Sequence, residues 1–200
     1  MLTATYTLVA LSVEQTSVRT SLQSLQKLLH STLRHQPALT PMQVDVACDT
    51  IRRLYESCHW RKLDKFLIPA LRRASSVADK LIDELDALSQ AASDAMATAL
   101  NLVEAAAVDS EARVRQFCSA LERFCSALLE RLEREERELF PMAGSVISGE
   151  DWFAIANQML AHDAHHQESR GGETRPRVGR GFMPRPERAQ RQGPPLSYAH

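Results

Sequence analysis

Residues 131–141 read RLEREERELFP, and residues 59–69 read HWRKLDKFLIP with the same internal spacing. A histidine and a glutamate four residues apart lie on one face of a helix, where they can bind a single metal ion. The stretch 131–141 has glutamate at the fifth position but arginine at the first, whereas 59–69 has histidine at the first but leucine at the fifth. The two stretches therefore predict a repeated helical motif that has lost a different half of a metal site in each copy.

The helix that carries residues 131–141 has the most regular apolar pattern in the chain. Apolar side chains recur there every three or four residues, as on one face of a helix, at Val114, Phe117, Leu121, Phe124 and Leu128. Similar stripes predict three more long helices, and no window has the alternation of a strand. We therefore expect an all-α fold, an up-down-up-down four-helix bundle with a short fifth helix and a disordered C-terminal tail.

Capping residues and prolines mark where these helices begin and end. Thr40 followed by Pro41 predicts the start of the second helix. Ser148 with Asp151 three residues later resembles a capping box, which would begin the short fifth helix. Pro69 should kink or interrupt the second helix, and the fourth helix should end near the proline of its own motif.

Composition divides the chain at residue 166. The 200 residues are 44% apolar, which suits one compact domain. Residues 167–200 hold seven arginines and three glutamates, a net charge of +4. Because the whole chain has a net charge of −1, residues 1–166 have a net charge of −5. The same segment holds five of the seven glycines and five of the nine prolines. We expect a helical-bundle domain over 1–166 and a disordered Arg/Pro/Gly-rich tail over 167–200.

The charge balance and the cysteines of the chain limit which kinds of partner and which cellular compartment are expected. The near-balance of 24 basic and 25 acidic residues predicts no nucleic-acid partner and no membrane partner, and it leaves a protein partner of unknown identity. The alternative is that the arginines of the tail contact RNA or an acidic partner. The four cysteines form no C-x-x-C pair, no secretory signal is evident, and the apolar stretch 2–13 is too short to span a bilayer. We expect a cytoplasmic protein with reduced thiols.

Polar residues interrupt the apolar stripes at one place in each long helix. Arg131 and Glu135 occupy stripe positions in the fourth helix, and His59 lies on the stripe of the second. Gln15 and Ser89 interrupt the first and third helices. A buried charge needs a partner or a metal ion, and inward polar residues at one level are how a bundle builds a metal site. For Arg131 and Glu135 an exposed i,i+4 ion pair is the alternative, and for Gln15 and Ser89 an exposed helix end.

Residues 130–142, ERLEREERELFPM, followed by Gly149-Glu150-Asp151-Trp152, resemble the fourth-helix signature of hemerythrin-like (HHE cation-binding) domains. Residues 59–71 resemble the companion motif of the second helix. The resemblance covers about residues 10–160 and implies a bundle around a non-haem di-iron centre, with roles in oxygen binding, in iron or oxygen sensing and storage, or in responses to nitric oxide.

Few of the positions at which the family has metal ligands hold a ligand residue in this chain. Glu135 and His59 match two ligands of the expected six. Arg131 and Leu63 replace their helix partners, and the remaining histidine positions map to about Gln15 and Ser89. We expect His59 and Glu135 to be the remnants of the site and no cofactor to be bound. Arg131, which is always protonated, would then take over the charge of the metal and pair with Glu135 or Glu136.

The sequence gives less support for any other metal site or for a catalytic site. His162, His165 and His166 with Asp163 could hold a divalent ion on the fifth helix, although such clusters are usually solvated. A zinc site of the cysteines with His59 fails because Cys118 and Cys125 are about 10 Å apart along one helix. No phosphate loop, nucleophile elbow or zinc-protease pair is present, so we expect no enzyme.

Two hypotheses about function therefore remain. In the first, the chain is a degenerate hemerythrin-like domain that lacks a competent di-iron site and works as a helical regulatory or interaction module. In the second, it is a metal-binding member in which His59 and Glu135, helped by Glu136 or Asp64, hold one iron or zinc ion for sensing or storage. Iron analysis separates the two.

Overall fold

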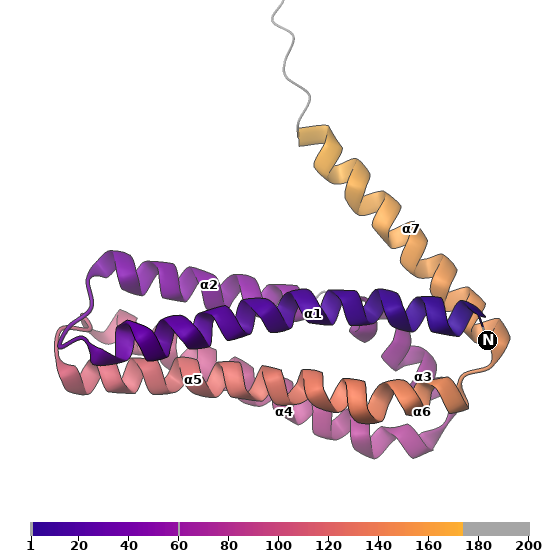
Figure 1. Cartoon of the computed structure of the whole chain (residues 1–200), viewed down its shortest axis with the longest axis horizontal. Helices are drawn as coiled ribbons and strands as arrows, with labels where there is room; N and C mark the ends of the chain where they lie inside the picture. Colours follow the sequence, from indigo (N-terminus) through magenta and orange to yellow (C-terminus); the bar gives the residue numbers. More distant parts are fainter. Residues whose placement is uncertain (1, 60, 174–200) are drawn as a thin grey trace, which may run out of the picture. The chain divides into compact units, whose positions relative to one another are not determined.

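Four long helical segments surround a common interior in the computed structural model, which describes residues 2–59 and 61–173 (Figure 1). The side chains of His59 and of residues 165–173 lie outside that description. The segments are helix α1 (Leu2–Ser31), α2 (Pro41–His59) with α3 (Ile68–Ala74), α4 (Asp79–Ala105), and α5 (Glu111–Arg134) with α6 (Phe140–Val146). Helix α1 contacts α2 and α5, and α4 also contacts α2 and α5, so each long helix has two neighbours. This confirms the all-α bundle.

Side-chain caps begin the helices where the sequence predicts them. The Gln43 backbone N–H donates to Thr40 Oγ1 at 3.3 Å, and Gln43 Oε1 accepts from the Thr40 backbone N–H at 2.9 Å, a reciprocal cap for α2. Ser75 accepts from the Val77 backbone N–H and begins a 3-10 turn (η3, Ser76–Ala78) that leads into α4. A second 3-10 turn (η1, Leu33–His35) follows α1.

Each copy of the repeated motif contains a π-helical turn at the same position. Residues Leu63–Leu67 (η2) and Glu135–Leu139 (η4) are π-helical, and each turn starts at the fifth residue of its motif. Each is followed by a short α-helix with proline in its first turn. Proline is tolerated there because it lacks only an N–H that would be unsatisfied anyway. The fourth helix therefore does not end near Pro141 as predicted, and α6 continues to Val146.

The second helix is interrupted earlier than Pro69. Helix α2 ends at His59, Arg61 is outside any regular element, and helical structure resumes at Lys62. The break lies before the π turn η2, and Pro69 lies in the first turn of α3. The predicted interruption is present, but proline is not the residue at which it occurs.

The last helix, α7 (Gly149–Glu173), begins at the predicted capping box and is longer than the short helix predicted. Ser148 Oγ accepts from the Asp151 backbone N–H at 3.2 Å. Residues up to Asp163 form one compact unit with the bundle, and residues from Ala164 form a second unit. The described part of the second unit consists of the last turns of α7, which extends beyond the predicted domain end at 166. The rest of the predicted tail, 174–200, lies outside the described residues.

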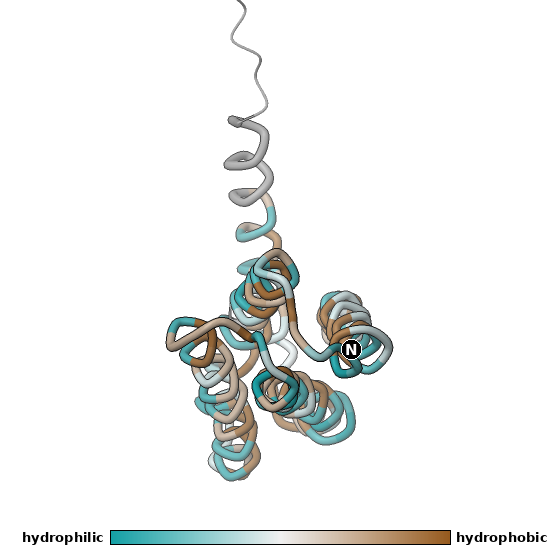
Figure 2. The backbone as a smooth tube through the Cα atoms, turned by 90° about the vertical axis from the view of Figure 1, so that its left-hand side faces the viewer, coloured by the Kyte–Doolittle hydropathy of each residue, from teal (hydrophilic) through white to brown (hydrophobic). Residues whose placement is uncertain are grey.

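Buried apolar side chains form two separate clusters along the bundle. One cluster includes Val18, and the other includes Leu11 and residues of α7 such as Trp152. Gln15, which is fully buried, lies between Leu11 and Val18 on α1. Figure 2 looks along the bundle and shows apolar and polar residues alternating around each helix. The level at which the two clusters separate is where the polar residues of the stripes point inward.

Candidate functional site

Polar side chains from all four long segments meet between the two apolar clusters. Glu135, at the start of η4, is 0% exposed, and Arg131, one turn before it, is 7% exposed. Arg61, in the break after α2, is 2% exposed. Their hydrogen bonds reach α1, η2 and α4. We refer to these residues as the ionic cluster: Gln15, Arg61, Asp64, Ser89, Arg131 and Glu135.

Glu135 accepts four hydrogen bonds, two at each carboxylate oxygen. Its Oε1 accepts from Arg131 Nε at 2.9 Å and from one terminal nitrogen of Arg61 at 3.1 Å. Its Oε2 accepts from Gln15 Nε2 at 2.6 Å and from the other terminal nitrogen of Arg61. Arg61 thus binds the carboxylate through both nitrogens, the strongest geometry for this pair of groups. The donors that surround Glu135 come from three different segments of the bundle.

Arg131 connects Glu135 to the other half of the cluster. Its two terminal nitrogens donate to Ser89 Oγ on α4 and to Asp64 Oδ1 in η2. The structure therefore confirms that Arg131 is buried and pairs with Glu135, and the exposed ion pair is excluded. Glu136, the other predicted partner, instead pairs with Arg19 at 2.7 Å near the surface.

The formal charges of the ionic cluster cancel. Arg61 and Arg131 contribute two positive charges, and Asp64 and Glu135 contribute two negative charges. Burial opposes the charge of Arg61, but attraction to Glu135 and Asp64 outweighs it and raises the pKa of Arg61. The pKa of Arg131 is raised in the same way, because Asp64 and Glu135 outweigh the effect of burial. Both guanidinium groups are therefore charged at neutral pH.

Asp64 is the least well satisfied charge of the cluster. Burial raises its pKa, and the attraction of Arg131 and Arg61 opposes this shift only in part. Its Oδ2 is buried without a hydrogen-bond partner among the described residues, as are Gln15 Oε1 and Arg61 Nε. An unpaired buried polar atom lowers the stability of the fold. The cluster is thus neutral overall but incompletely hydrogen-bonded.

Four of the six predicted site positions come together in the ionic cluster. Gln15, Ser89, Arg131 and Glu135 lie there as predicted from the stripes. Leu63 is fully buried in the apolar cluster that contains Leu11, where it packs as a core side chain. The side chain of His59 lies outside the described residues, so its predicted role stays a prediction.

Sequence reasoning missed Arg61. The prediction placed His59 on the inward face of the second helix. In the structure Leu54 is buried, whereas Tyr55, one turn before His59, is only partly buried. Leu54 and Cys58 are buried four residues apart on one face of α2. Helix α2 ends at His59, however, so helical spacing does not continue to Arg61, and the sequence gives no clear signal for its burial.

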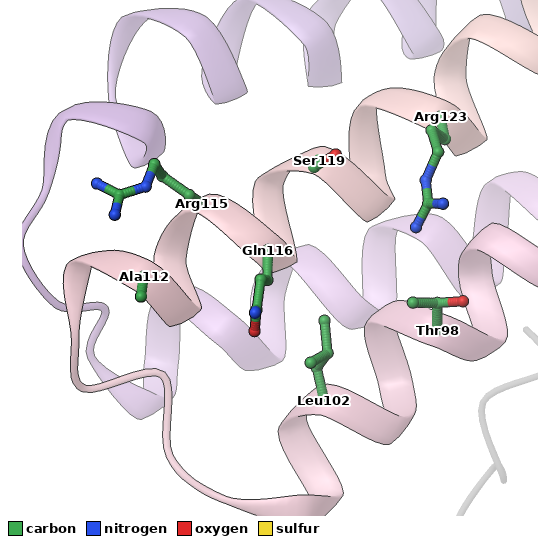
Figure 3. Close-up of a pocket in the computed structure, with 7 residues that line it drawn as sticks. All are labelled: Thr98, Leu102, Ala112, Arg115, Gln116, Ser119 and Arg123. Carbon is green, nitrogen blue, oxygen red and sulfur yellow. The ribbon is translucent and has the colours of Figure 1, made fainter.

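A cavity of about 280 Å³ adjoins the ionic cluster. Asp64, Ser89 and Arg131 form one part of its wall, and Cys58 and Tyr55 of α2 form another. Burial raises the pKa of the Cys58 thiol to about 11, so the thiol is protonated at neutral pH and is a poor nucleophile and metal ligand. A larger surface hollow of about 620 Å³ between α4 and α5 shares no residue with the cluster; Figure 3 shows Arg115, Arg123 and the other side chains that line it.

The alternative metal sites are not assembled in the described part of the chain. Lys65 Nζ lies 3.1 Å from His162 Nε2, and Lys62 pairs with Asp163 at 2.8 Å. The side chains of His165 and His166 lie outside the described residues. All four cysteines are buried and free. Within residues 2–58 and 61–164, no three His, Cys, Asp or Glu side chains are grouped so that they could hold a metal ion.

The ionic cluster does not suit a di-iron centre. Such a centre requires several imidazole and carboxylate ligands around two cations. Here the carboxylate at a ligand position, Glu135, has both oxygens engaged by arginine and glutamine donors. Arg61 and Arg131 also place two permanent positive charges against this carboxylate, and they would repel a cation bound beside it in a buried site.

The fold and its central polar layer define a helical bundle of the type that houses a buried site among its four long helices. A family model for the hemerythrin HHE cation-binding domain matches residues 10–143, and the chain belongs to this family. The match spans both copies of the repeated motif and every residue of the ionic cluster. No curated protein and no solved structure matches the chain. In the described part of the chain, no helix is long and apolar enough to cross a bilayer.

Proposed function

We propose that this protein is a metal-free member of the hemerythrin family in which the ionic cluster replaces the di-iron centre, and that it works as a helical regulatory or interaction module. The observation that carries the proposal is the engagement of both Glu135 oxygens by Arg61, Arg131 and Gln15. In this view the bundle keeps the architecture of the family, while two guanidinium groups supply the positive charge that the metal ions supply in other members.

The hydrogen bonds at Glu135 support this proposal because a metal ion could bind Glu135 only after these bonds were broken. A metal ion that used Glu135 as a ligand would have to displace Arg131 or Arg61 from it. The displaced guanidinium would then be buried beside a second positive charge with one carboxylate fewer to balance it, which is strongly unfavourable. The ionic cluster and a metal ion therefore compete for the same carboxylate.

Metal analysis of the purified protein tests the proposal. The chain should be produced without a histidine tag in iron-supplemented medium and analysed for iron and zinc by mass spectrometry, with its absorption spectrum recorded. We expect a colourless protein with far less than one metal ion per chain. Iron near one or two equivalents, with an oxo-to-iron absorption band, would instead support the second hypothesis of a metal-binding sensor or storage protein.

A variant with restored ligands provides the positive control. It combines Gln15→His, Leu63→Glu, Ser89→His and Arg131→His with Arg61→Ala, which removes the remaining buried guanidinium. Because four of these five positions lie in the ionic cluster, three of them in direct contact with Glu135, the variant should take up iron that the natural sequence excludes. Iron uptake by this variant alone would show that the side chains, and not the scaffold or the assay, set the difference.

The proposal includes no catalytic activity, no nucleic-acid partner and no membrane partner. It places the protein in the cytoplasm, which agrees with four buried, unpaired cysteines. An activity screen is less informative than a search for protein partners, because the cluster contains no nucleophile activated by an adjacent base.

A further inference from the structure

The N-terminal half of α1 carries a stripe of exposed apolar side chains. Leu2, Tyr6, Val9 and Val13 are between 56% and 91% exposed. Their spacing of four, three and four residues places all four on one narrow face of the helix, opposite the face that buries Leu11 and Gln15. We call these four residues the α1 stripe. Four exposed apolar side chains in a row along one face of a helix are typical of an interaction surface.

The helix around the α1 stripe is uncharged. Residues 2–13 contain no Asp, Glu, Lys or Arg, and the first charged residue is Glu14. Glu14 faces the bundle, where it accepts a hydrogen bond from the Lys62 backbone N–H. Interface cores are depleted of charge and enriched in aromatic residues such as Tyr6. The composition of this segment is that of an interface and not of a solvated helix face.

The spacing within the α1 stripe is the same when it is read in either direction. From this symmetry we infer that a second copy of the chain packs on the stripe, with the two α1 helices antiparallel. A two-fold axis between residues 7 and 8 then places Leu2 against Val13 of the other copy and Tyr6 against Val9 of the other copy. Such an isologous pair is the commonest form of homodimer, and an uncharged stripe can face itself without repulsion.

A membrane surface fits the α1 stripe less well. Helices that lie in a bilayer interface carry lysines or arginines on their polar face, which attract anionic lipids. The first basic residue of α1 is Arg19, and it pairs with Glu136 at 2.7 Å. The absence of basic residues on the polar face beside the stripe therefore favours a protein surface over a membrane surface.

The size of the α1 stripe predicts a weak dimer. Only four exposed side chains from each copy would form its core, which gives an interface at the small end of the range for specific association. Interfaces at this end of the size range are typically weak and transient, so we expect the monomer–dimer equilibrium to fall in the micromolar range that sedimentation can follow. This inference does not depend on whether the core binds metal, so its failure would leave the proposed function untouched.

Sedimentation equilibrium of the full chain between about 1 and 200 µM tests the dimer. In the dimer, Val9→Glu places one carboxylate from each copy near the centre of the interface. It should weaken association at least tenfold. The matched control is Met42→Glu, an equally non-conservative change at an exposed residue of α2 outside the stripe. Circular dichroism of each variant checks that the helices are intact. A monomer at all concentrations, or equal weakening by both variants, would overturn the inference.

Disulfide trapping tests the antiparallel arrangement. Leu2→Cys and Val13→Cys variants are oxidised mildly, each alone and as a mixture, with the wild-type chain as control for the four buried native thiols. The inference requires the mixture to yield a disulfide-linked dimer faster than either variant alone. Faster linkage within the single variants would mean parallel helices and would refute it. So would binding of the monomer to phosphatidylcholine vesicles without self-association.

Discussion

Glu135 is fully buried and is held by four hydrogen bonds from three residues, two of which are positively charged. Removing one partner of a buried ion pair is costly because it leaves the other charge buried without compensation. Glu135 balances part of the charge of both Arg61 and Arg131. It is therefore the residue on which the stability of the ionic cluster most depends.

The first prediction at this scale concerns Glu135→Gln. The amide keeps the shape of the side chain but not its charge, so Arg61 and Arg131 are left with Asp64 alone. We expect the free energy of unfolding in urea to fall by about 3–5 kcal/mol. The matched control is Glu133→Gln, which removes an exposed pair with Arg137 and should cost less than about 1 kcal/mol. Equal effects of the two substitutions would contradict a buried, mutually dependent cluster.

The second prediction concerns the pH dependence contributed by Asp64. Because burial raises its pKa, the folded protein binds this proton more tightly than the unfolded chain does. The stability that protonated Asp64 contributes is therefore full at low pH. It is lost as pH rises from the ordinary aspartate pKa of about 4 toward the raised value. The unfolding free energy of the wild type minus that of Asp64→Asn should fall across this window.

Glu138 provides a control of opposite sign for the Asp64 experiment. A hydrogen bond from Arg134 lowers the pKa of Glu138, so its contribution is present above the ordinary glutamate pKa and is lost as pH falls. The wild type minus Glu138→Gln difference should accordingly rise with pH. If the Asp64 difference also rose with pH, Arg131 would dominate over burial at that carboxylate.

Sequence reasoning at the residue scale was most successful where a charge interrupted a regular stripe. Arg131 and Glu135 were predicted to pair because both fall on apolar positions of one helix, and their contact is local in sequence. Arg61 was missed because its partner lies 74 residues away and because the helix around it breaks. A single sequence gives little warning of a contact that depends on such a break.

At the scale of elements, the two π turns are the clearest trace of the repeat. Turns η2 and η4 begin at equivalent motif positions, with Leu63 and Glu135 as their first residues. A π turn closes on the fifth residue instead of the fourth, and such turns occur mostly inside α-helices at functional sites. In this protein the turn remains in both copies, although the predicted metal ligands beside it are largely replaced.

The third prediction tests whether η4 is an inserted residue within a helix. Deleting the exposed Arg137 should convert the π turn into an α turn and leave the apolar faces of α5 and α6 in phase. Deleting the exposed Ser126 from the middle of α5 should instead rotate everything after it by about 100° relative to the core. We expect the Arg137 deletion to keep a cooperative urea transition and the Ser126 deletion to lose it. Similar losses in both would mean that η4 is not a removable insertion.

Element boundaries were predicted where local chemistry sets them and missed where tertiary packing does. Thr40 and Ser148 begin helices by accepting hydrogen bonds from nearby backbone N–H groups. Helix α6 was missed because Pro141 stops an α-helix only if its missing N–H is needed, and the preceding π turn removes that need. Sequence periodicity alone does not reveal a π turn.

At the scale of the whole molecule, the bundle could be predicted because apolar stripes fix which faces turn inward. The division of the core into two apolar clusters follows from the same stripes, since each is interrupted once. The stripes do not specify which hydrogen bonds and ion pairs the interrupting polar residues form with one another. That depends on side-chain geometry across helices far apart in sequence.

The fourth prediction concerns the whole fold in the presence of iron. A ligand that binds only the folded state raises the melting temperature, by an amount that grows with its concentration over its dissociation constant. We expect no change in melting temperature when ferrous iron is added anaerobically or when a chelator is added. The variant with restored ligands should show a clear rise with iron. A saturable rise for the natural sequence would place a metal site in this protein after all.

The ionic cluster also has a consequence for the alignment of the helices. Sliding one helix by a turn, about 5.4 Å, would preserve its apolar periodicity but would move a charged or polar side chain into an apolar cluster. Buried polar groups can select one register in this way, at some cost in stability. Because every long segment contributes to the cluster, uniform sliding of any of them is penalised. The connections between the helices therefore do not have to set that alignment.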